Sequence, residues 1–268
     1  MGAKKFIHEC KANTVAYREY FWVNFKTVLE YKMSSFIQIS AMFLNDVVWI
    51  SFWWIFFARF PLINGWTYRE LLILWSIGAL SFGLSGILFG NRSKLGEVII
   101  RGRLDYFLAL PKNVLLHALS SKITISAFGD ALFGLALGLI IFTPTELPLY
   151  IYLAFLSAII LTSFGVIIGS LSFFFSTTEK VNKTIWNATV GLTLYPTNVY
   201  DGLAKFLLFV IIPVGFVSGV PTEILRVPSP EGIAVMTIVT IIIALIASLI
   251  FYAGIKKYES GNLIYVNA

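Results

Sequence analysis

The sequence predicts an all-α integral membrane protein with six transmembrane helices, and composition is the first reason. The chain has 268 residues, of which 58% are hydrophobic and 13% charged, and its mean hydropathy is +0.83. Soluble domains carry about 25% charged residues, so this chain has too little polar surface to coat a soluble particle. A span needs about 20 apolar residues, so the length holds roughly six spans in one domain, 1–268.

The positions of the apolar runs are the second reason. They fall at 36–58, 71–90, 123–142, 149–175, 185–220 and 232–255. All but one have the length of a single span. The exception, 185–220, is interrupted by Pro196 and Pro213. It is too long for one crossing and too short for two crossings with a loop.

The distribution of basic residues is the third reason. With the amino terminus inside, six crossings place 16 of the 20 Lys and Arg residues on the cytoplasmic side. Two crossings by 185–220 would instead invert the last span and put Lys256 and Lys257 outside. We therefore predict one crossing over 185–195, then a re-entrant hairpin over 203–220 before the last span. Both termini are then cytoplasmic.

Residues 1–35 predict an N-terminal interfacial helix. Tyr17, Phe21, Phe25 and Val28 recur at helical spacing, with charged residues on other sides. Such a helix would lie flat in the membrane interface with its aromatic side toward the lipid. A cytosolic helix is the alternative.

The longest cytoplasmic loop, 91–122, is amphipathic rather than polar. Its apolar residues predict a helix over 97–110 that stops at Pro111, although Gly102 favours either close approach of a partner or a break between two short helices. The residues alone allow two readings. The segment docks on a cytosolic partner, or it lies on lipid.

Several function classes find no support in the sequence. There is no G-x-x-x-x-G-K-[ST] phosphate loop, zinc motif or nucleophile elbow, so we predict that the chain is not an enzyme and binds no cofactor. Cys10 has no disulfide partner, and two histidines make no metal cluster. The net charge of +6 fits anionic lipid head groups better than nucleic acid.

Two carboxylates interrupt predicted spans, and each costs at least about 2.5 kcal/mol at a span centre. Asp46 lies in mid-span beside Asn45, and Asp130 lies near the cytoplasmic end of its span. Either carboxylate could serve a polar pathway, a cation site or a proton relay, or could bond to a neighbouring helix. We favour the structural bond for Asp130 and leave both readings open for Asp46.

Tryptophans flank the predicted outer loop between the first two spans. They are Trp49, Trp53, Trp54, Trp66 and Trp75. An aromatic belt at the membrane interface explains most of them. Stacking of one indole on a ligand is the alternative.

Four blocks of sequence resemble a subgroup of the ABC type-2 permeases. They are GRLDYFLALP at 102–111, AFGDALFG at 127–134, the stretch from LYPTNVYDG to VPTEIL at 194–225, and AGIKKYESGN at 253–262. They occur in family order and cover most of the chain. The resemblance implies a six-span half-transporter with a cytoplasmic coupling helix and re-entrant helices before the sixth span.

The resemblance also implies partners. Members pair with an identical or homologous permease and dock separate ATP-binding-cassette ATPase subunits, which hold the ATP and Mg. The ATPase contact would be formed by Gly102, Arg103, Leu104, Asp105, Tyr106 and Pro111. The translocation pathway would involve Asn45, Asp46, Asp130, Pro196 and Pro213. Some relatives are linked to export of drugs or cationic toxic compounds, so a drug, a toxic cation or a lipid-like molecule is the expected cargo, at the cell membrane of a prokaryote.

Two rival functions are also compatible with these residues. An ion-coupled secondary transporter would use Asp46 and Asp130, although the chain lacks the inverted repeat that many such transporters carry. A membrane scaffold without transport activity is the other. A neighbouring reading frame for a phosphate-loop ATPase would favour the exporter.

Overall fold

The computed structural model describes residues 2–63, 65–175 and 178–259, and this part of the chain is helical with no β-strand. The longer helices are α1 (Gly2–Glu30), α2 (Lys32–Arg59), α3 (Tyr68–Leu88), α7 (Ala127–Ile141), α8 (Leu147–Ser170), α9 (Thr178–Thr193) and α12 (Pro230–Ile255). The shorter ones are η1 (Arg92–Lys94), α4 (Leu95–Ile100), α5 (Leu104–Leu108), α6 (Val114–Ser120), η2 (Leu171–Phe173), η3 (Thr197–Val199), α10 (Gly202–Val210), η4 (Pro213–Phe216) and α11 (Gly219–Arg226).

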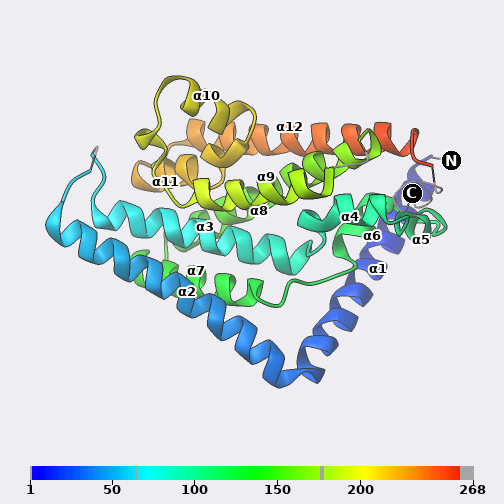
Figure 1. The fold of residues 1–268 in the computed structure, drawn as a ribbon, viewed down its shortest axis with the longest axis horizontal. Coiled ribbons are helices and arrows are strands. Elements are labelled where there is room, and N and C mark those ends of the chain that lie inside the picture. Colours follow the sequence, from blue (N-terminus) through cyan, green and yellow to red (C-terminus); the bar gives the residue numbers. More distant parts are fainter. Residues whose placement is uncertain (1, 64, 176–177, 260–268) are drawn as a thin grey trace.

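The long helices other than α1 form an elongated bundle (Figure 1). Helices α4, α5 and α6 gather at one end, where α12 also finishes, and α10 and α11 lie toward the other end. Helix α1 turns away from α2 and slants back toward α6. We call the end with α4–α6 the inner end and the opposite one the outer end.

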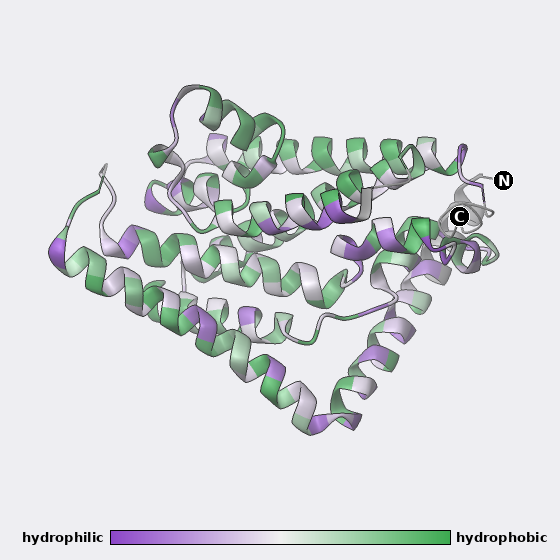
Figure 2. Ribbon diagram, in the orientation of Figure 1, coloured by the Kyte–Doolittle hydropathy of each residue, from purple (hydrophilic) through white to green (hydrophobic). Residues whose placement is uncertain are grey.

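Four described helices are long and apolar enough to cross a membrane: α2, α3, α8 extended through η2, and α12. Figure 2 shows α12 as almost continuously hydrophobic, whereas hydrophilic residues mark α1 and α4. Helix α10 and the stretch Pro213–Arg226 form a further candidate, bent by 66° at a short break. Helix α7 is apolar but shorter. The six-crossing plan therefore stays a prediction.

One of the two readings of Gly102 is confirmed, and two predicted boundaries are wrong. The segment predicted as a helix over 97–110 is broken into two short helices, because Gly102 adopts a φ of +67° between α4 and α5. The crossing predicted from 185 belongs to α9, which begins earlier, at Thr178. In its first turns the Asn182 side chain donates to the Ser172 hydroxyl at 3.1 Å. The N-terminal helix ends at Glu30, and 32–35 belong to α2.

Helix α1 also differs in the direction of its aromatic stripe. Tyr17 donates to the Leu88 carbonyl at 3.4 Å, and the Phe25 ring lies 6.3 Å from that of Phe128. Buried Val28 completes this face. The stripe therefore packs on the protein, since the ends of α3 and α7 offer it apolar surface and a free carbonyl.

Close packing of α3 against α7 forms the centre of the bundle. A Cβ on Gly83 would stand 2.4 Å from the Ala131 backbone nitrogen, so only glycine allows this approach. Tyr150 of α8 reaches the same seam, where its hydroxyl contacts the Gly134 carbonyl at 2.7 Å and the Ser76 carbonyl at 3.2 Å. Buried apolar residues of α3, α8 and α12 continue this core toward the outer end.

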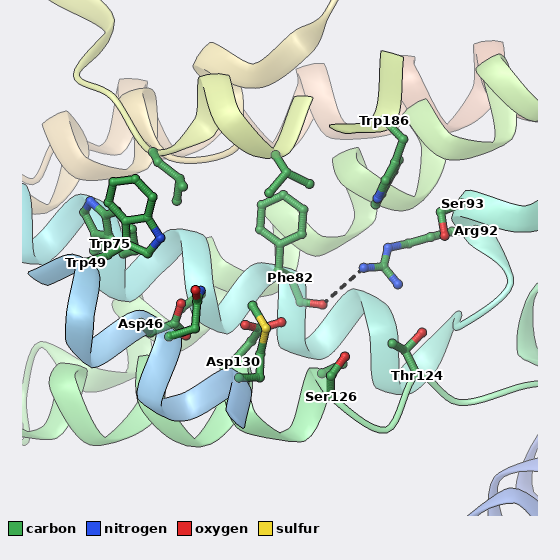
Figure 3. Close-up of a pocket in the computed structure, with 16 residues that line it drawn as sticks. Asp46, Trp49, Trp75, Phe82, Arg92, Ser93, Thr124, Ser126, Asp130 and Trp186 are labelled. Carbon is green, nitrogen blue, oxygen red and sulfur yellow. Dashed lines mark hydrogen bonds between the residues drawn. The ribbon is translucent and has the colours of Figure 1, made fainter. Parts of the chain in front are cut away.

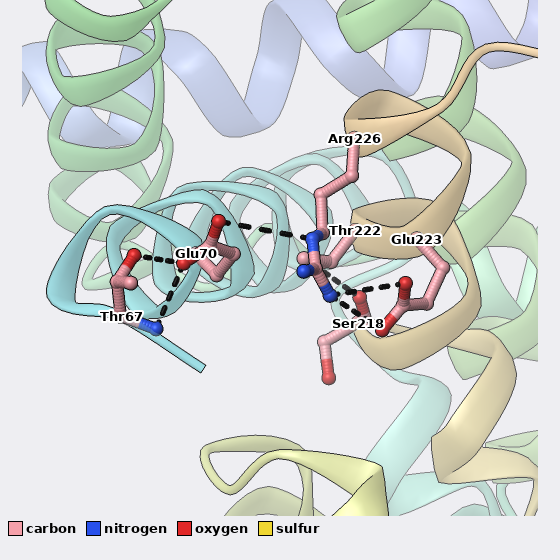
Figure 4. A network of polar contacts seen from close by, with 6 residues as sticks. All are labelled: Thr67, Glu70, Ser218, Thr222, Glu223 and Arg226. Carbon is pink, nitrogen blue, oxygen red and sulfur yellow. Dashed lines mark hydrogen bonds and ion pairs between the residues drawn. The ribbon is translucent and has the colours of Figure 1, made fainter. Parts of the chain in front are cut away.

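A polar network ties α11 to the start of α3 at the outer end (Figure 4). Glu70 caps α3 by accepting the Thr67 backbone N–H at 2.8 Å and its hydroxyl. Arg226 lies 3.8 Å from the Glu70 carboxylate and 3.2 Å from that of Glu223. Its guanidinium also lies 5.8 Å from the Trp66 ring centre. These contacts hold the bent pair against the first outer turn of α3.

Candidate functional site

A cavity of about 230 Å³ lies between α2, α3, α7 and α9, with η1 at its inner end. Figure 3 shows Trp49 and Trp75 at one end of the view, Arg92 and Trp186 at the other, and two aspartates between them. The polar lining is completed by Asn45, Ser93, Thr124 and Ser126. The remaining lining residues are Met42, Ala79, Phe82, Ala127, Val190 and Leu194.

Asp46 and Asp130 meet across the α2–α7 contact, and their carboxyl groups interact directly. Gly129 makes the contact possible, because a Cβ there would stand 2.4 Å from the Ile39 carbonyl oxygen. Asp46 is only 5% exposed and also contacts the Asn45 side chain. Asp130 thus contacts a neighbouring helix, as a structural role requires, but this contact lies on the wall of a cavity rather than in a closed core.

Arg92 supplies the positive charge of the cavity and is 6% exposed. Its guanidinium lies 5.0 Å from the Trp186 ring centre and donates weakly to the Phe82 carbonyl at 3.5 Å. Gly165 gives its backbone room, since a Cβ there would stand 2.8 Å from the Arg92 carbonyl oxygen. Asp130 is the carboxylate with which it interacts electrostatically. A buried cation of this kind persists only where charge and hydrogen bonds compensate it.

The second candidate region is the inner-end segment 95–120, formed by α4, α5 and α6 and called here the coupling region. Leu104 and Phe107 of α5 are buried in one apolar cluster with Phe173, next to α8, and Phe251 of α12. The opposite side of α5 faces outward, and Tyr106 is 63% exposed. The coupling region is therefore fixed to the inner ends of two candidate spans while it presents a free face.

Charges on the coupling region are exposed and paired within it. The Glu97 carboxylate lies 3.3 Å from Arg101 and 2.9 Å from Arg103. On the other side, burial raises the pKa of Tyr258, and the nearby Asp105 carboxylate adds to the shift. Tyr258 belongs to the tail block 253–262, of which 260–262 lie outside the described residues, so the tail meets the coupling region directly.

The structure gathers the predicted site residues into separate places. Asn45, Asp46 and Asp130 share the cavity. The predicted ATPase contact, Gly102 to Tyr106 with exposed Pro111, lies in the coupling region. Pro196 and Pro213 are buried near the outer end, and neither lines the cavity.

Arg92 and Trp186 line the cavity but were not predicted. Arg92 stands among the basic residues of the 91–122 loop, where the sequence predicts an ordinary cytoplasmic charge. Trp186 lies alone in a moderately polar stretch. One feature of the sequence pointed to a buried cation. Two acidic residues lie inside predicted spans, and intramembrane charges usually pair with a charge of opposite sign.

Comparison with protein families gives the identity. Residues 22–261, about nine-tenths of the chain, match the family described as ABC-2 family transporter protein. No curated protein and no solved structure matched the chain. The match includes all the candidate spans, the cavity and the coupling region. The chain belongs to the ABC-2 family of transporter proteins and is a membrane permease of an ABC transporter.

Proposed function

We propose that this permease is one half of the membrane domain of an ATP-driven exporter. Two such chains, identical or homologous, would form the translocation pathway, and separate ATPase subunits would bind the ATP and Mg. Six crossings with both termini in the cytoplasm of a prokaryotic cell complete the proposal. The family match supports this reading and does not favour the ion-coupled alternative.

The observation that carries the proposal is the anchoring of the coupling region. Leu104 and Phe107 bury α5 in the apolar cluster that also contains Val166 of α8 and Phe251 of α12, and α4, the helix before α5, packs directly on α8. A force applied to α5 is therefore transmitted through this cluster to the inner ends of both helices. Packed cores shift as units rather than deform continuously. An ATPase that closes on ATP and pushes α5 would thereby tilt the two helices and change access to the pathway.

The exposed face of α5 has the composition of a protein contact. Tyr106 and Leu108 expose apolar surface, and the guanidinium groups of Arg101 and Arg103 flank it. Tyrosine and arginine are enriched among residues that dominate binding energies. The proposed cargo is a drug, a toxic cation or a lipid-like molecule.

Co-purification tests the proposal. The permease, tagged, is co-expressed with candidate phosphate-loop ATPases from the same genome and extracted in mild detergent. We expect the ATPase to co-purify and its ATP hydrolysis to respond to Tyr106→Ala. Permease that is folded and inserted but retains no ATPase would contradict the proposal.

A further inference from the structure

The cavity between α2, α3, α7 and α9 has unused hydrogen-bonding capacity of two kinds. Arg92 Nε and Trp75 Nε1 are buried donors, and Asp46 Oδ2 is a buried carboxyl oxygen. None of the three atoms has a hydrogen-bond partner among the described residues. Their side chains all line the cavity, and each is more than nine-tenths buried. Unpartnered polar atoms in such surroundings are costly, so three of them around one cavity indicate that a bound molecule completes their bonding.

The charges of the lining already balance one another. Its charged residues are Asp46, Asp130 and Arg92. The two carboxyl groups interact directly. Two carboxyl groups in contact inside a buried site cannot both ionise, so the pair shares one proton and carries one negative charge. Arg92 supplies one positive charge beside it. A ligand with a net charge would disturb this balance, so the bound molecule is neutral.

The unpartnered atoms define the polar groups of the ligand. The Arg92 and Trp75 nitrogens only donate, so both need acceptors. Because Asp46 Oδ2 has no partner, its carboxyl group contacts Asp130 through the other oxygen, and Oδ2 is left as an acceptor that needs a donor. An ammonium group only donates, and a carbonyl or ether oxygen only accepts. A hydroxyl group does both, so a neutral molecule with several hydroxyl groups satisfies all three atoms.

The rest of the lining fits the same class of molecule. Trp49 and Trp75 line the cavity with ring centres 6.1 Å apart at an interplanar angle of 30°, and Trp186 lines it at the other end (Figure 3). Indole faces offer broad apolar contact. Small side chains that both donate and accept complete the wall, and these are Asn45, Ser93, Thr124 and Ser126. A sugar ring or a cyclic polyol carries C–H groups on its faces and hydroxyl groups around its edge, so it matches both parts of this wall.

The size and the opening of the cavity limit the ligand further. The volume of about 230 Å³ lies below the range of about 300–1,000 Å³ typical of drug-sized ligands, so the cavity holds one ring rather than a chain of rings. Asn45 and Trp49 line the cavity and are also exposed on α2. The rest of a larger molecule can therefore extend past α2 while its ring stays inside.

We infer that each permease binds a neutral polyhydroxylated ring in the cavity between α2, α3, α7 and α9, with Arg92 and Trp75 donating to its oxygens and Asp46 accepting from one of its hydroxyl groups. The ring is either a free sugar or cyclic polyol, or the head group of a glycosylated lipid. The inference rests on the proposed function and deepens it, because it names the chemical class that enters the pathway.

The test measures equilibrium binding to the full-length permease in phosphatidylcholine nanodiscs, without ATPase or nucleotide. The labelled probes are glucose and myo-inositol, and empty nanodiscs give the background. The competitors are glucosamine, protonated in mildly acidic buffer, glucuronate, which is anionic, and tetrahydropyran, which is a ring without hydroxyl groups. We expect saturable binding of a neutral probe, with each competitor at least about tenfold weaker, because the charged rings unbalance the site and the bare ring leaves the three atoms unpartnered.

A second set of nanodiscs distinguishes the two sources of the ring. These discs also contain a monoglucosyl diacylglycerol. Loss of glucose binding in them assigns the site to a lipid head group, and unchanged glucose binding assigns it to a free sugar or polyol. Both results support a site for a neutral hydroxylated ring.

Variants locate the site. Trp75→Phe removes one unpartnered donor and keeps an aromatic ring, so it should weaken binding of the neutral probe about tenfold. Trp49→Phe is the matched control, because that indole is 39% exposed and needs no partner inside the cavity, and it should change the affinity no more than about twofold.

Three results would overturn the inference. They are the absence of saturable binding of both neutral probes, which would leave the cavity to water, a charged or bare ring that competes as well as glucose, and equal affinities in the two tryptophan variants. The wild-type comparison of probes does not depend on the folding of any variant.

ATPase co-purification is measured separately on the same preparations. Failure of ring binding with normal ATPase docking would refute this inference alone, and failure of docking with normal ring binding would refute the proposed function alone.

Discussion

The two groups of charged side chains in this permease differ in what surrounds them. In the coupling region, Arg101 and Arg103 pair with Glu97 while their own side chains stay about half exposed. In the cavity, Asp46 and Arg92 are almost fully buried, and their hydrogen bonding is incomplete. Exposed pairs contribute little to stability, so their charges are available to a partner. Buried charges are costly, so their retention points to a function inside the membrane.

The largest effect should come from removing the buried cation. Arg92→Met leaves Asp130 without its positive neighbour, and breaking a buried pair costs about 3–5 kcal/mol. We expect a large fall in thermal stability in detergent, measured by the unfolding of the purified permease. Arg103→Met is the matched control in the exposed group and should cost no more than about 1 kcal/mol. Equal losses in the two variants would remove the contrast between the groups.

The anchor of the coupling region should show the next largest effect. Phe107→Ala removes a buried ring, which typically costs about 3–5 kcal/mol where the site cannot collapse. Because that ring holds α5 in the apolar cluster that includes residues of α8 and α12, we expect ATP hydrolysis to become uncoupled from the permease even when some ATPase is retained. Tyr106→Ala, one residue away and exposed, should instead preserve stability and lower ATPase retention. Identical behaviour of the two variants would argue against separate anchoring and docking faces.

Charge reversal at Arg103 should weaken docking while membrane insertion stays intact. Arg103→Glu also places a second carboxylate beside Glu97, so the loss has two sources. The double variant Glu97→Arg, Arg103→Glu restores the internal pair and separates them. We expect the single variant to retain several-fold less ATPase in pull-down and the double variant not to recover it. Full recovery would show that the effect was internal. Asp105→Lys should behave like the single variant.

The smallest effect concerns pH and His117 of α6. Burial lowers the pKa of His117 below its ordinary value of 6.5, and Lys112 adds to the shift. Its ring packs edge-on against Tyr20 of α1 at 5.3 Å. The folded protein binds the proton less readily than the unfolded chain, so stability is constant above about pH 6.5 and falls as the pH drops below that value. Melting temperatures of wild type and His117→Gln between pH 7.5 and 5.5 should diverge, with the larger fall in wild type.

The sequence predicted the helical membrane fold and the family because those depend on long-range composition. The spans, the charge bias and the order of the four blocks each depend on many residues, so a wrong interpretation of one residue does not change the prediction. The hydropathy pattern also located Asp46 and Asp130, since a carboxylate in an apolar run is conspicuous.

Placement of individual side chains was not predictable in the same way. The sequence around Arg92 does not tell whether this side chain lies in an exposed loop or against Trp186. Its position depends on the close packing of Gly86 and Gly165 around it. The break in the coupling region depends on one residue, Gly102, which adopts a positive φ; from the sequence, a break was one of two readings and close approach of a partner was the other. Whether the aromatic stripe of α1 faces lipid or protein depends on what lies opposite it, and the spacing of residues along the helix does not contain that information.

Protection of a single cysteine tests directly whether the coupling region docks the ATPase. In a Cys10→Ser background, Tyr106→Cys introduces one reactive thiol on the exposed face of α5, and Thr145→Cys introduces one between α7 and α8, far from it. Maleimide labelling rates are measured for the permease alone and with its ATPase bound. We predict that bound ATPase slows labelling at 106 and leaves labelling at 145 unchanged. Equal rates at 106 with and without bound ATPase would show that the exposed face of α5 is not the docking surface.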